Sequence, residues 1–504
     1  MGYDLFPHQT QFYDKLLQGK RLILNHATGS GKTLTALAAY EFLREHSLVK
    51  RALVIVPASL KDNFIENIHH FGFNYSYTVL ESPGDFLNVA DIYIVSYTYA
   101  SQNTDLFSQL SYQVIIADEI HKVKNRRSVG YKSLETIFKR SKYILALSAS
   151  ITNNTTEELL ALFDLVAGKN LSKQVKDLVV SVKKRLWSKL TRPASPEATI
   201  KIKKADKFKS ILSPHFDYVD PKEISDITGR PAEIIRYIDV PMSKEQSILY
   251  LHALETVGRE YLSNFHKGDI KDRELSGFFM RLAAARQTLI DPGYMMNQRG
   301  IYAVMDEGKL AQLAKDVQTI LNQNPEHSIL VFSTFVGFGV KTIKEVLSSI
   351  GVSSLIFTGE MTRREKERTT QAFKDRSTSV LVLSAAGAEG LDFPFVSHVI
   401  ILDPHWNPEV MRQMRSRGVR AGGTSYWNQV RISIYRAKLA GDIKSKGKSI
   451  WSKTAQDTVD DWIIAVAERK TNNNILLKQA ITGLPRRKIT EAFYLIRRLR
   501  NTYS

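Results

Sequence analysis

The chain has 504 residues, of which 24% are charged and 43% hydrophobic, and its formal net charge is +19. At roughly 150 residues per domain this length predicts about three domains of ordinary globular composition. The absence of cysteine excludes disulfides, thiolate catalysis and cysteine-bound zinc. No apolar run approaches the roughly 20 residues of a membrane span, and no signal peptide precedes the first strand, so we expect a cytoplasmic protein.

The positive charge is concentrated in two segments. Residues 169–209 contain 13 lysines and arginines against 3 acidic residues, and residues 411–504 contain 20 against 6. Once these surpluses of 10 and 14 are subtracted from +19, the rest of the chain has a net charge of −5. Localised basic surfaces on a mildly acidic body indicate contacts with a nucleic-acid backbone. The alternative is solubilising charge, which would be spread more evenly.

The first strand and helix surround a glycine-rich loop. The apolar residues 21–25 predict a strand, and the alanine- and leucine-rich residues 34–43 predict a helix. A strand, a glycine loop and a helix in this order are typical of a site whose backbone N–H groups surround a triphosphate at a helix N-terminus. The residues that we expect to bind ATP here are Thr28, Gly29, Ser30, Gly31, Lys32 and Thr33.

Two side chains of this loop carry the expected chemistry. Lys32 would reach the β and γ phosphates, and Thr33 would place its hydroxyl on Mg²⁺, which prefers oxygen ligands. The strict pattern G-x-x-x-x-G-K-[ST] fails at its first position, because residue 26 is histidine. An ordinary solvated turn is the alternative for a glycine loop that stands alone.

A second element makes that alternative improbable. The apolar residues 114–117 predict a buried strand that ends in Asp118-Glu119-Ile120-His121. Two adjacent carboxylates after such a strand are costly unless a cation or a reaction uses them. We therefore expect Asp118 to bind Mg²⁺ and Glu119 to orient and deprotonate the attacking water. An exposed acidic turn would explain this element by itself, but not both elements in this order.

Polar residues follow two other buried strands of the first half, at residues 52–56 and 92–95. Ligands of an open α/β sheet lie beyond the carboxyl ends of its strands. The residues that we expect to contact nucleic acid there are Pro57, Ser59, Ser96 and Tyr97.

The alternation of strands and helices predicts the domain organisation. Up to residue 168 it indicates a parallel α/β domain, and it returns from residue 306 to 482 with strands near residues 328–333, 354–358, 379–384 and 399–403. Between them, residues 169–305 show helical periodicity without buried parallel strands and predict a basic, largely helical insertion. Residues 483–504 are expected to form a basic C-terminal helix.

Several longer motifs resemble those of Snf2-like superfamily 2 DNA motors along nearly the whole chain. Residues 118–125 read DEIHKVKN, residues 403–408 read DPHWNP, and residues 413–420 read QMRSRGVR. The insertion is also similar to the segments that join the two lobes of such motors, at residues 281–292 and 308–310. Since the chain has little outside the motor, it resembles phage-encoded branch-migrating helicases more than chromatin remodellers, which implies a phage-infected bacterial host.

The resemblance implies two RecA-like domains and further site residues. Gln9 would read adenine, although a surface glutamine is nearly as good an account of it. Arg417 and Arg420, three residues apart, would be arginine fingers. Other ATP contacts would be Gly390 and Asp392, and further DNA contacts would be Ser333, Thr358 and Gly359. Basic residues of the insertion are expected to hold DNA outside the motor, with the solvated helix face as their alternative: Lys183, Lys184 and Arg185, with Trp187 stacking on an unpaired base.

The function that we expect is an ATP-dependent DNA helicase or translocase that acts on branched DNA such as forks and four-way junctions. The resemblance implies tracking from 3′ to 5′, with ATP and Mg²⁺ as cofactors. One alternative is a duplex translocase that displaces bound proteins without separating strands, and another is an ATP-gated scaffold that clamps DNA. An RNA helicase is disfavoured, because DEIH continues into KVKN and the last motif lacks H-R-x-G-R.

Overall fold

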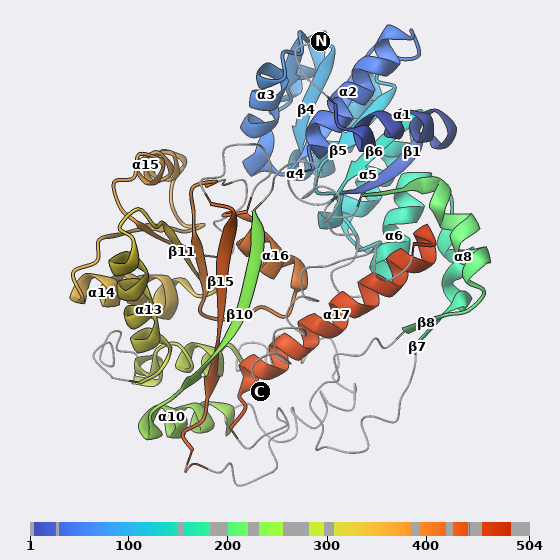
Figure 1. Cartoon of the computed structure of the whole chain (residues 1–504). Coiled ribbons are helices and arrows are strands. Elements are labelled where there is room, and N and C mark those ends of the chain that lie inside the picture. Colours follow the sequence, from blue (N-terminus) through green and yellow to red (C-terminus); the bar gives the residue numbers. More distant parts are fainter. Residues whose placement is uncertain are drawn as a thin grey trace. The chain divides into compact units, whose positions relative to one another are not determined.

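The computed structural model in Figure 1 describes most of the chain. The described residues are 5–26, 30–148, 156–181, 200–219, 231–255, 282–296, 307–384, 391, 393–419, 427–441, 443 and 456–484. They divide into two compact units. The first unit holds the described residues up to 181, together with 200–219 and 473–484, and the second holds those from 231 to 472.

The first unit is built on a seven-stranded parallel sheet with strand order β3-β4-β2-β5-β6-β1-β9. Its strands are short, and β2, β4, β5 and β6 are almost wholly apolar, as expected for strands that are covered on both faces. They are β1 (Arg21–His26), β2 (Ala52–Val56), β3 (Tyr77–Val79), β4 (Ile92–Ser96), β5 (Val114–Ala117), β6 (Tyr143–Leu147) and β9 (Phe216–Val219).

Helices cover both faces of this sheet. Successive residues of a strand point to opposite faces, so Leu22 and Ile23 of β1 belong to different hydrophobic cores. The helices are α1 (Pro7–Gly19), α2 (Lys32–Glu45), α3 (Lys61–His70), α4 (Tyr97–Gln102), α5 (Val129–Lys139), α6 (Thr156–Ala167), α7 (Leu171–Val175) and α8 (Ala205–Leu212). A small antiparallel hairpin of β7 (Val179–Ser181) and β8 (Ile200–Ile202) completes the unit.

The second unit is built on a six-stranded parallel sheet with strand order β10-β15-β14-β11-β13-β12. The strands are β10 (Ala232–Pro241), β11 (Ile329–Ser333), β12 (Ser354–Phe357), β13 (Val380–Ser384), β14 (His398–Ile401) and β15 (Gln429–Lys438). Its helices are α10 (Lys244–Glu255), α13 (Lys309–Gln323), α14 (Thr342–Ser349), α15 (Arg363–Lys374), α16 (Pro408–Ser416) and α17 (Val459–Thr482). The predicted pair of RecA-like parallel-sheet domains is confirmed.

The segment between the two predicted domains differs from expectation in one respect. Its periodicity predicts no parallel strands between residues 169 and 305, yet β9 pairs with β1 in the first sheet and β10 pairs with β15 in the second. Both are edge strands. β9 has only four residues, and in β10 only Ile235 and Val240 are buried, so neither presents the continuous apolar run by which the other strands are recognised.

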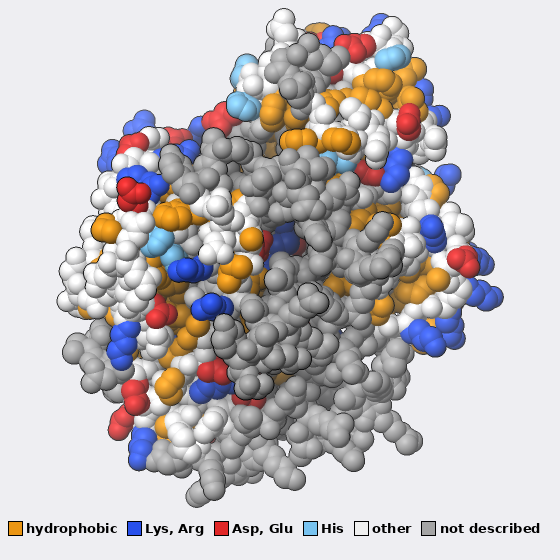
Figure 2. All heavy atoms as spheres, viewed as in Figure 1, with side chains coloured by type: hydrophobic (Ala, Val, Ile, Leu, Met, Phe, Trp, Pro, Cys, Tyr) orange, Lys and Arg blue, Asp and Glu red, His pale blue; other side chains and the backbone are white. Residues whose placement is uncertain are grey.

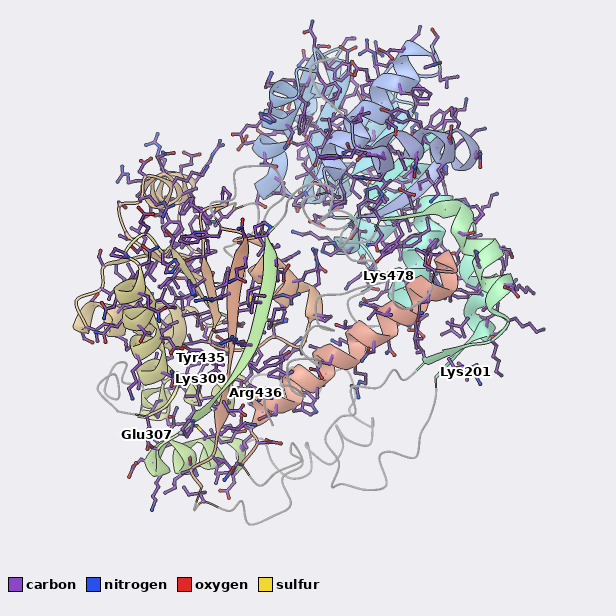
Figure 3. All side chains as sticks on the ribbon, viewed as in Figure 1. Lys201, Glu307, Lys309, Tyr435, Arg436 and Lys478 are labelled. Atoms are coloured by element: carbon purple, nitrogen blue, oxygen red, sulfur yellow. The ribbon has the colours of Figure 1, made fainter. Side chains whose placement is uncertain are left out.

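The last helix also joins a core that the sequence does not indicate. Leu477 and Ile481 of α17 are buried in a core of the first unit, with Lys478 over the ring of Tyr218 at 5.4 Å. Figure 3 labels Lys478 on this part of the helix. Within the described residues, no helix combines the length and apolar character that crossing a membrane requires.

Candidate functional site

The predicted site residues of the first unit lie at one edge of its sheet. All of its strands are parallel, so the glycine loop after β1, the carboxylates after β5 and Ser148 after β6 lie at the carboxyl edge. β6 separates β1 from β5 in the sheet. The charge of Lys32 opposes the rise in the pKa of Asp118, so the two predicted elements are close enough to interact electrostatically.

The glycine loop has the backbone form that a phosphate-binding loop requires. Gly31 has a φ of +73° and immediately precedes α2, whose first residue is Lys32. A Cβ at Gly31 would lie 2.7 Å from Nε2 of Gln9, so only glycine fits there. Lys32 Nζ donates a hydrogen bond to the carbonyl of His26 at 3.1 Å, and Thr33 is half-buried beside it. Thr28 and Gly29 lie outside the described residues.

The residues at the start of α1 support the loop from behind. Gln9 is fully buried, which rules out the surface alternative, and its Nε2 lies 3.3 Å from the carbonyl of Gly31. His8 Nε2 donates to the carbonyl of Ser30 at 3.2 Å. Adenine recognition by Gln9 stays a prediction. The contact of His8 was not predicted from the sequence.

A buried ion pair holds the start of the loop. His26, at the end of β1, is fully buried, and its Nε2 lies 2.6 Å from Oδ2 of Asp217 on β9. The other carboxylate oxygen of Asp217 accepts a hydrogen bond from Lys15 Nζ at 2.6 Å. Burial by itself would raise the pKa of Asp217, but the hydrogen bonds and charges of His26 and Lys15 outweigh burial and lower this pKa to about 2. The histidine that departs from the usual loop pattern therefore has a structural partner.

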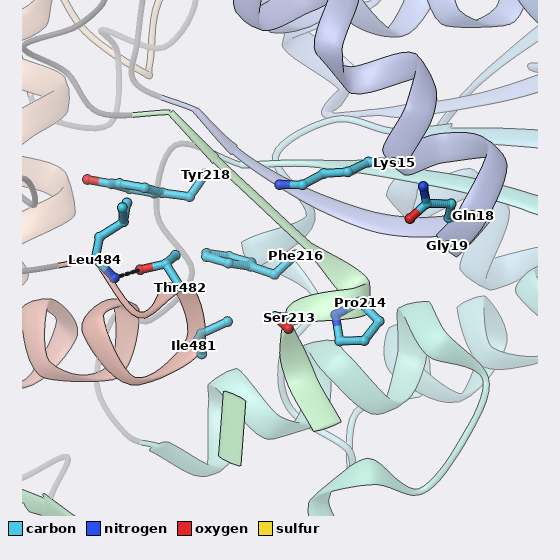
Figure 4. A pocket seen from close by; sticks show the side chains of 10 residues that line it. All are labelled: Lys15, Gln18, Gly19, Ser213, Pro214, Phe216, Tyr218, Ile481, Thr482 and Leu484. Atoms are coloured by element: carbon cyan, nitrogen blue, oxygen red, sulfur yellow. Dashed lines mark hydrogen bonds between the residues drawn. The ribbon is translucent and has the colours of Figure 1, made fainter. Parts of the chain in front are cut away.

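A cavity of about 520 Å³ lies beside this ion pair (Figure 4). Lys15 and Gln18 come from α1, Phe216 and Tyr218 from β9, and Ile481 from α17. Phe216 and Tyr218 flank Asp217, and their rings lie nearly parallel at 6.4 Å. The cavity is thus lined by both α17 and β9, the strand whose Asp217 contacts His26.

The two carboxylates after β5 are electrostatically strained. Burial, together with the neighbouring charge of Glu119, raises the pKa of Asp118 to about 7, against the opposing charge of Lys32. Glu119 is in the left-handed region at a φ of +51°, which an L-residue adopts only when its surroundings demand it. Four other described residues with side chains share a positive φ, so this feature supports the site without defining it.

A chain of polar contacts leads from Glu119 back to the first strand. His121 Nδ1 lies 3.1 Å from Glu119 Oε2 and 3.1 Å from the hydroxyl of Ser148 at the end of β6. The carbonyl of Ser148 accepts a hydrogen bond from the side-chain amide of Asn25 in β1, at 3.1 Å. The path links the carboxylates to the strand that carries the glycine loop.

The predicted DNA contacts of the first unit have varied surroundings. Ser59 is exposed, whereas Pro57 is buried. Ser96 is 8% exposed, and its hydroxyl accepts the hydrogen bond from Tyr99 N that caps α4. Tyr97 donates its hydroxyl hydrogen to the carbonyl of Asp118 at 2.7 Å. Ser96 and Tyr97 thus have structural partners, and contact with DNA stays a prediction for all four.

The predicted contacts of the second unit also lie at strand ends. Gly359 is exposed, Thr358 and Ser333 are buried, and the hydroxyl of Ser333 accepts a hydrogen bond from Phe335 N at 3.3 Å. Arg417 is 8% exposed and donates from Nη1 to the carbonyl of Leu391 at 3.1 Å. The predicted residues that lie outside the described ranges are Gly390, Asp392, Arg420, Lys183, Lys184, Arg185 and Trp187.

Motif residues of the second unit hold its strand ends together. Arg286 donates to the carbonyl of Pro404 at 2.9 Å, and it lies over the rings of Phe335 and Trp406. Lys309 is fully buried; its Nζ lies 2.6 Å from Asp460 and donates to the carbonyl of Leu402 at 2.6 Å. Figure 3 labels Lys309 in the interior of the unit. The segment that contains Arg286 and the start of α13 therefore contact the residues that follow β14, where the DPHWNP motif begins.

The residues of the first unit fit ATP and Mg²⁺. The hydroxyl of Ser30 is buried and has no hydrogen-bond partner within the described residues, so it is available to a ligand in the loop. No described group of three histidines or acids could enclose a metal by itself. Mg²⁺ binds one or two protein oxygens and completes its shell with water and phosphate oxygens, so the hydroxyl of Thr33 and the carboxylate of Asp118 would suffice to hold it. Bound there, Mg²⁺ would neutralise charge on the terminal phosphates.

Comparisons with known proteins agree with this division of the chain. The family described as "Type III restriction enzyme, res subunit" matches residues 2–153, and the "Helicase conserved C-terminal domain" matches residues 311–422. The chain is 24% identical to the "Uncharacterized ATP-dependent helicase YqhH" of Bacillus subtilis over 82% of this chain and 73% of the relative.

Both matched families follow the order of the two sheets, and the relative extends across both. The chain is similar to ATP-dependent helicases across both of its sheets. A second relative is the "Putative ATP-dependent helicase/translocase YwqA" of the same bacterium, 21% identical over 83% of this chain and 44% of the relative. The helicase domain of Hef from Pyrococcus furiosus has the same fold, with a TM-score of 0.51 and 17% identity over 85% of this chain and 95% of that one.

Like the ATP-dependent helicases to which it is similar, the chain is an ATP hydrolase that uses Mg²⁺. Sequence reasoning missed the supporting residues His8, His26, Asp217 and Lys15. His8 stands next to the predicted Gln9, and His26 is conspicuous as the departure from the loop pattern. Asp217 gives no such signal, because its strand lies in a segment whose periodicity predicts helices.

Proposed function

We propose that the chain is a DNA-dependent ATPase that translocates from 3′ to 5′ and unwinds or branch-migrates forks and four-way junctions. The observation that carries the ATPase part is the arrangement of Gly31, Lys32, Asp118 and Glu119 at one carboxyl edge of a parallel sheet. The uneven positive charge favours a nucleic acid as the polymer, and the DEIHKVKN motif favours DNA over RNA.

In the proposed reaction each residue has one task. Lys32 binds the terminal phosphates, while Thr33 and Asp118 supply oxygens to the metal. Glu119 takes a proton from the attacking water, and its contact with His121 holds its carboxylate in position. Arg417 and Arg420 stabilise the charge that develops on the transferred phosphoryl group. The remaining predicted contacts at the strand ends hold the DNA backbone, and Gln9 reads adenine.

One experiment tests the substrate and the reaction together. ATP hydrolysis and strand separation are measured on single-stranded DNA, duplex, fork, four-way junction and RNA. We expect DNA to stimulate multiple turnovers and branched DNA to be separated most rapidly. Stimulation by RNA alone would contradict the DNA assignment, and binding without repeated turnover would indicate an ATP-gated scaffold. Partial duplexes with opposite overhangs test the polarity.

A duplex translocase without strand separation is the second candidate. Since YwqA carries the name helicase/translocase, both activities need a separate measurement. Displacement of streptavidin from a biotinylated duplex, with no unwinding of a fork, would favour this candidate over the first.

A further inference from the structure

The β7–β8 hairpin and the neighbouring helices carry a dense group of lysines. Among residues 169–181 and 200–209, eight lysines are exposed, against only two exposed acids, Asp177 and Asp206. Figure 2 shows positively charged side chains over this part of the first unit, at the right of the view. The lysines are Lys169, Lys173, Lys176, Lys201, Lys203, Lys204, Lys207 and Lys209. We call the surface formed by these eight side chains the hairpin surface.

Within the described residues, none of these eight lysines forms a salt bridge. Other surface cations of the same unit do: Arg44 lies 2.9 Å from Asp91, and Lys124 lies 2.9 Å from Glu158. Scattered solubilising charge would show the same mixture of signs throughout the unit. The hairpin surface therefore concentrates positive charge that is not paired by any acidic residue in the described part of the chain.

The segments that carry these lysines are packed against the first unit. Ile200, Ile202 and Val179 of the hairpin pack against a core of the first unit, and Lys203 N donates to the carbonyl of Leu178 at 2.7 Å. Lys201 and Lys203 are two residues apart on one side of the strand, opposite these isoleucines, and Figure 3 labels Lys201 at this edge. Phe208 and Leu212 bury the inner face of α8 and leave Lys207 outside.

We infer that the hairpin surface binds the phosphate backbone of a DNA duplex, as a second contact outside the strand-end residues. Lysines are compact point charges that suit phosphate oxygens and read no base sequence. This inference rests on the proposed function for its ligand class. It assigns to the hairpin surface a duplex arm of the branched substrate, while the tracked strand occupies the motor.

The test replaces three lysines of the hairpin and α8, in the variant K201A/K203A/K207A. A matched control removes three exposed lysines of the same unit elsewhere, K50A/K132A/K142A. Lys50 and Lys142 precede β2 and β6, at the sheet edge opposite the glycine loop. The full-length proteins are compared for affinity to a blunt duplex over a range of KCl concentrations, without ATP.

We expect the hairpin variant to bind duplex roughly tenfold more weakly at low salt, with a slope of log K against log [salt] flatter by about 0.9 for each phosphate that is no longer neutralised. The control should stay close to wild type. Substitution by arginine, K201R/K203R/K207R, should keep the affinity, which separates an effect of charge from an effect on folding. Equal affinity and equal slope in the alanine variant and its control would overturn the inference.

A second readout separates this inference from the proposed function. ATP hydrolysis without DNA, and at saturating single-stranded DNA, should be unchanged in the hairpin variant, whereas four-way junction unwinding should fall. Reduced single-strand-stimulated hydrolysis would contradict the assignment of the hairpin surface to a separate arm. If wild type shows no DNA-stimulated hydrolysis, the proposed function fails, and duplex affinity still decides the hairpin surface.

Discussion

The two units use their buried charges for different purposes. In the first unit the partly buried Asp118 and Glu119 are adjacent at the end of a strand, the charge of Lys32 acts on Asp118, and the pKa of Asp118 is raised to about 7. In the second unit Lys309 and Asp460 are 0% and 1% exposed and lie 2.6 Å apart. Two adjacent carboxylates that repel one another attract a cation, while a closed ion pair holds chain segments together. The charged residues that we propose for chemistry in the first unit therefore contrast with a pair that has a structural role in the second.

The largest effect should come from removing a charge at the proposed ATP site of the first unit. Lys32→Ala and Glu119→Gln should each reduce ATP turnover by roughly 10³-fold or more, because charge stabilisation and water activation are removed. Thermal unfolding should change little, and DNA binding should persist. Glu119→Gln should also retain bound ATP, which nucleotide trapping on a filter would detect. Substantial residual turnover in both variants would mean that the site has been misplaced.

Arg417 tests whether the second unit contributes to chemistry. As an arginine finger it stabilises the transition state, so Arg417→Ala should lower kcat by about 10³-fold with a small change in KM. The same is expected of Arg420→Ala. Arg417 also donates to the carbonyl of Leu391, so a structural role would lower stability instead. Steady-state kinetics with parallel calorimetry distinguish the two, and an effect confined to KM would contradict the finger.

The closed ion pair should respond through stability. Asp460→Asn leaves the buried Lys309 ammonium without its carboxylate, and removal of one partner of a buried pair costs about 3–5 kcal/mol. We expect unfolding of the second unit at lower denaturant concentration, measured by the change of Trp406 or Trp427 fluorescence. ATP affinity should stay near wild type. Replacement of both partners, K309M/D460L, should recover part of the stability.

Asp217, which contacts His26, is the counterpart of Asp460 in the first unit. Because its pKa is lowered to about 2 in the folded protein, its contribution to stability is full above the unfolded value near 4 and is lost as pH falls to about 2. Asp217→Asn should cost about 2–3 kcal/mol at pH 7 and almost nothing at pH 2. It should also raise the KM for ATP, since His26 loses the partner that anchors the loop. An unchanged KM would confine Asp217 to a structural role.

The last prediction concerns how the free energy of unfolding of the second unit depends on pH. Burial, with the nearby His327 and Arg431, lowers the pKa of His398 in the second unit to about 4. The folded state therefore favours neutral His398, and this stability is present above pH 6.5 and is lost as pH falls toward 4. His398→Phe should flatten the pH dependence of unfolding of the second unit by at most about 3 kcal/mol across this window. Chemical denaturation at several pH values measures it, and an unchanged slope would contradict the assignment.

The sequence by itself determined the parts of this protein that depend on local patterns. Continuous apolar runs identified most of the buried parallel strands, and glycine spacing with a following Lys32 identified the loop, because backbone geometry and helix polarity act within a few residues. The DEIH carboxylates were recognisable because they follow so apolar a strand. These signals sufficed for two parallel sheets and for an ATP hydrolase.

Tertiary structure decided what depends on partners far apart in the chain. Asp217 reaches His26 across 191 positions, and Lys309 reaches Asp460 across 151, so no local pattern marks either pair. β9 and β10 are edge strands whose pairing is determined by the sheets they join, and their own residues lack a continuous apolar run. The end of α17 is buried in the first unit because Leu477 and Ile481 find apolar partners there. Periodicity shows that a face will be buried, but the choice of the covering surface is made by packing over the whole molecule.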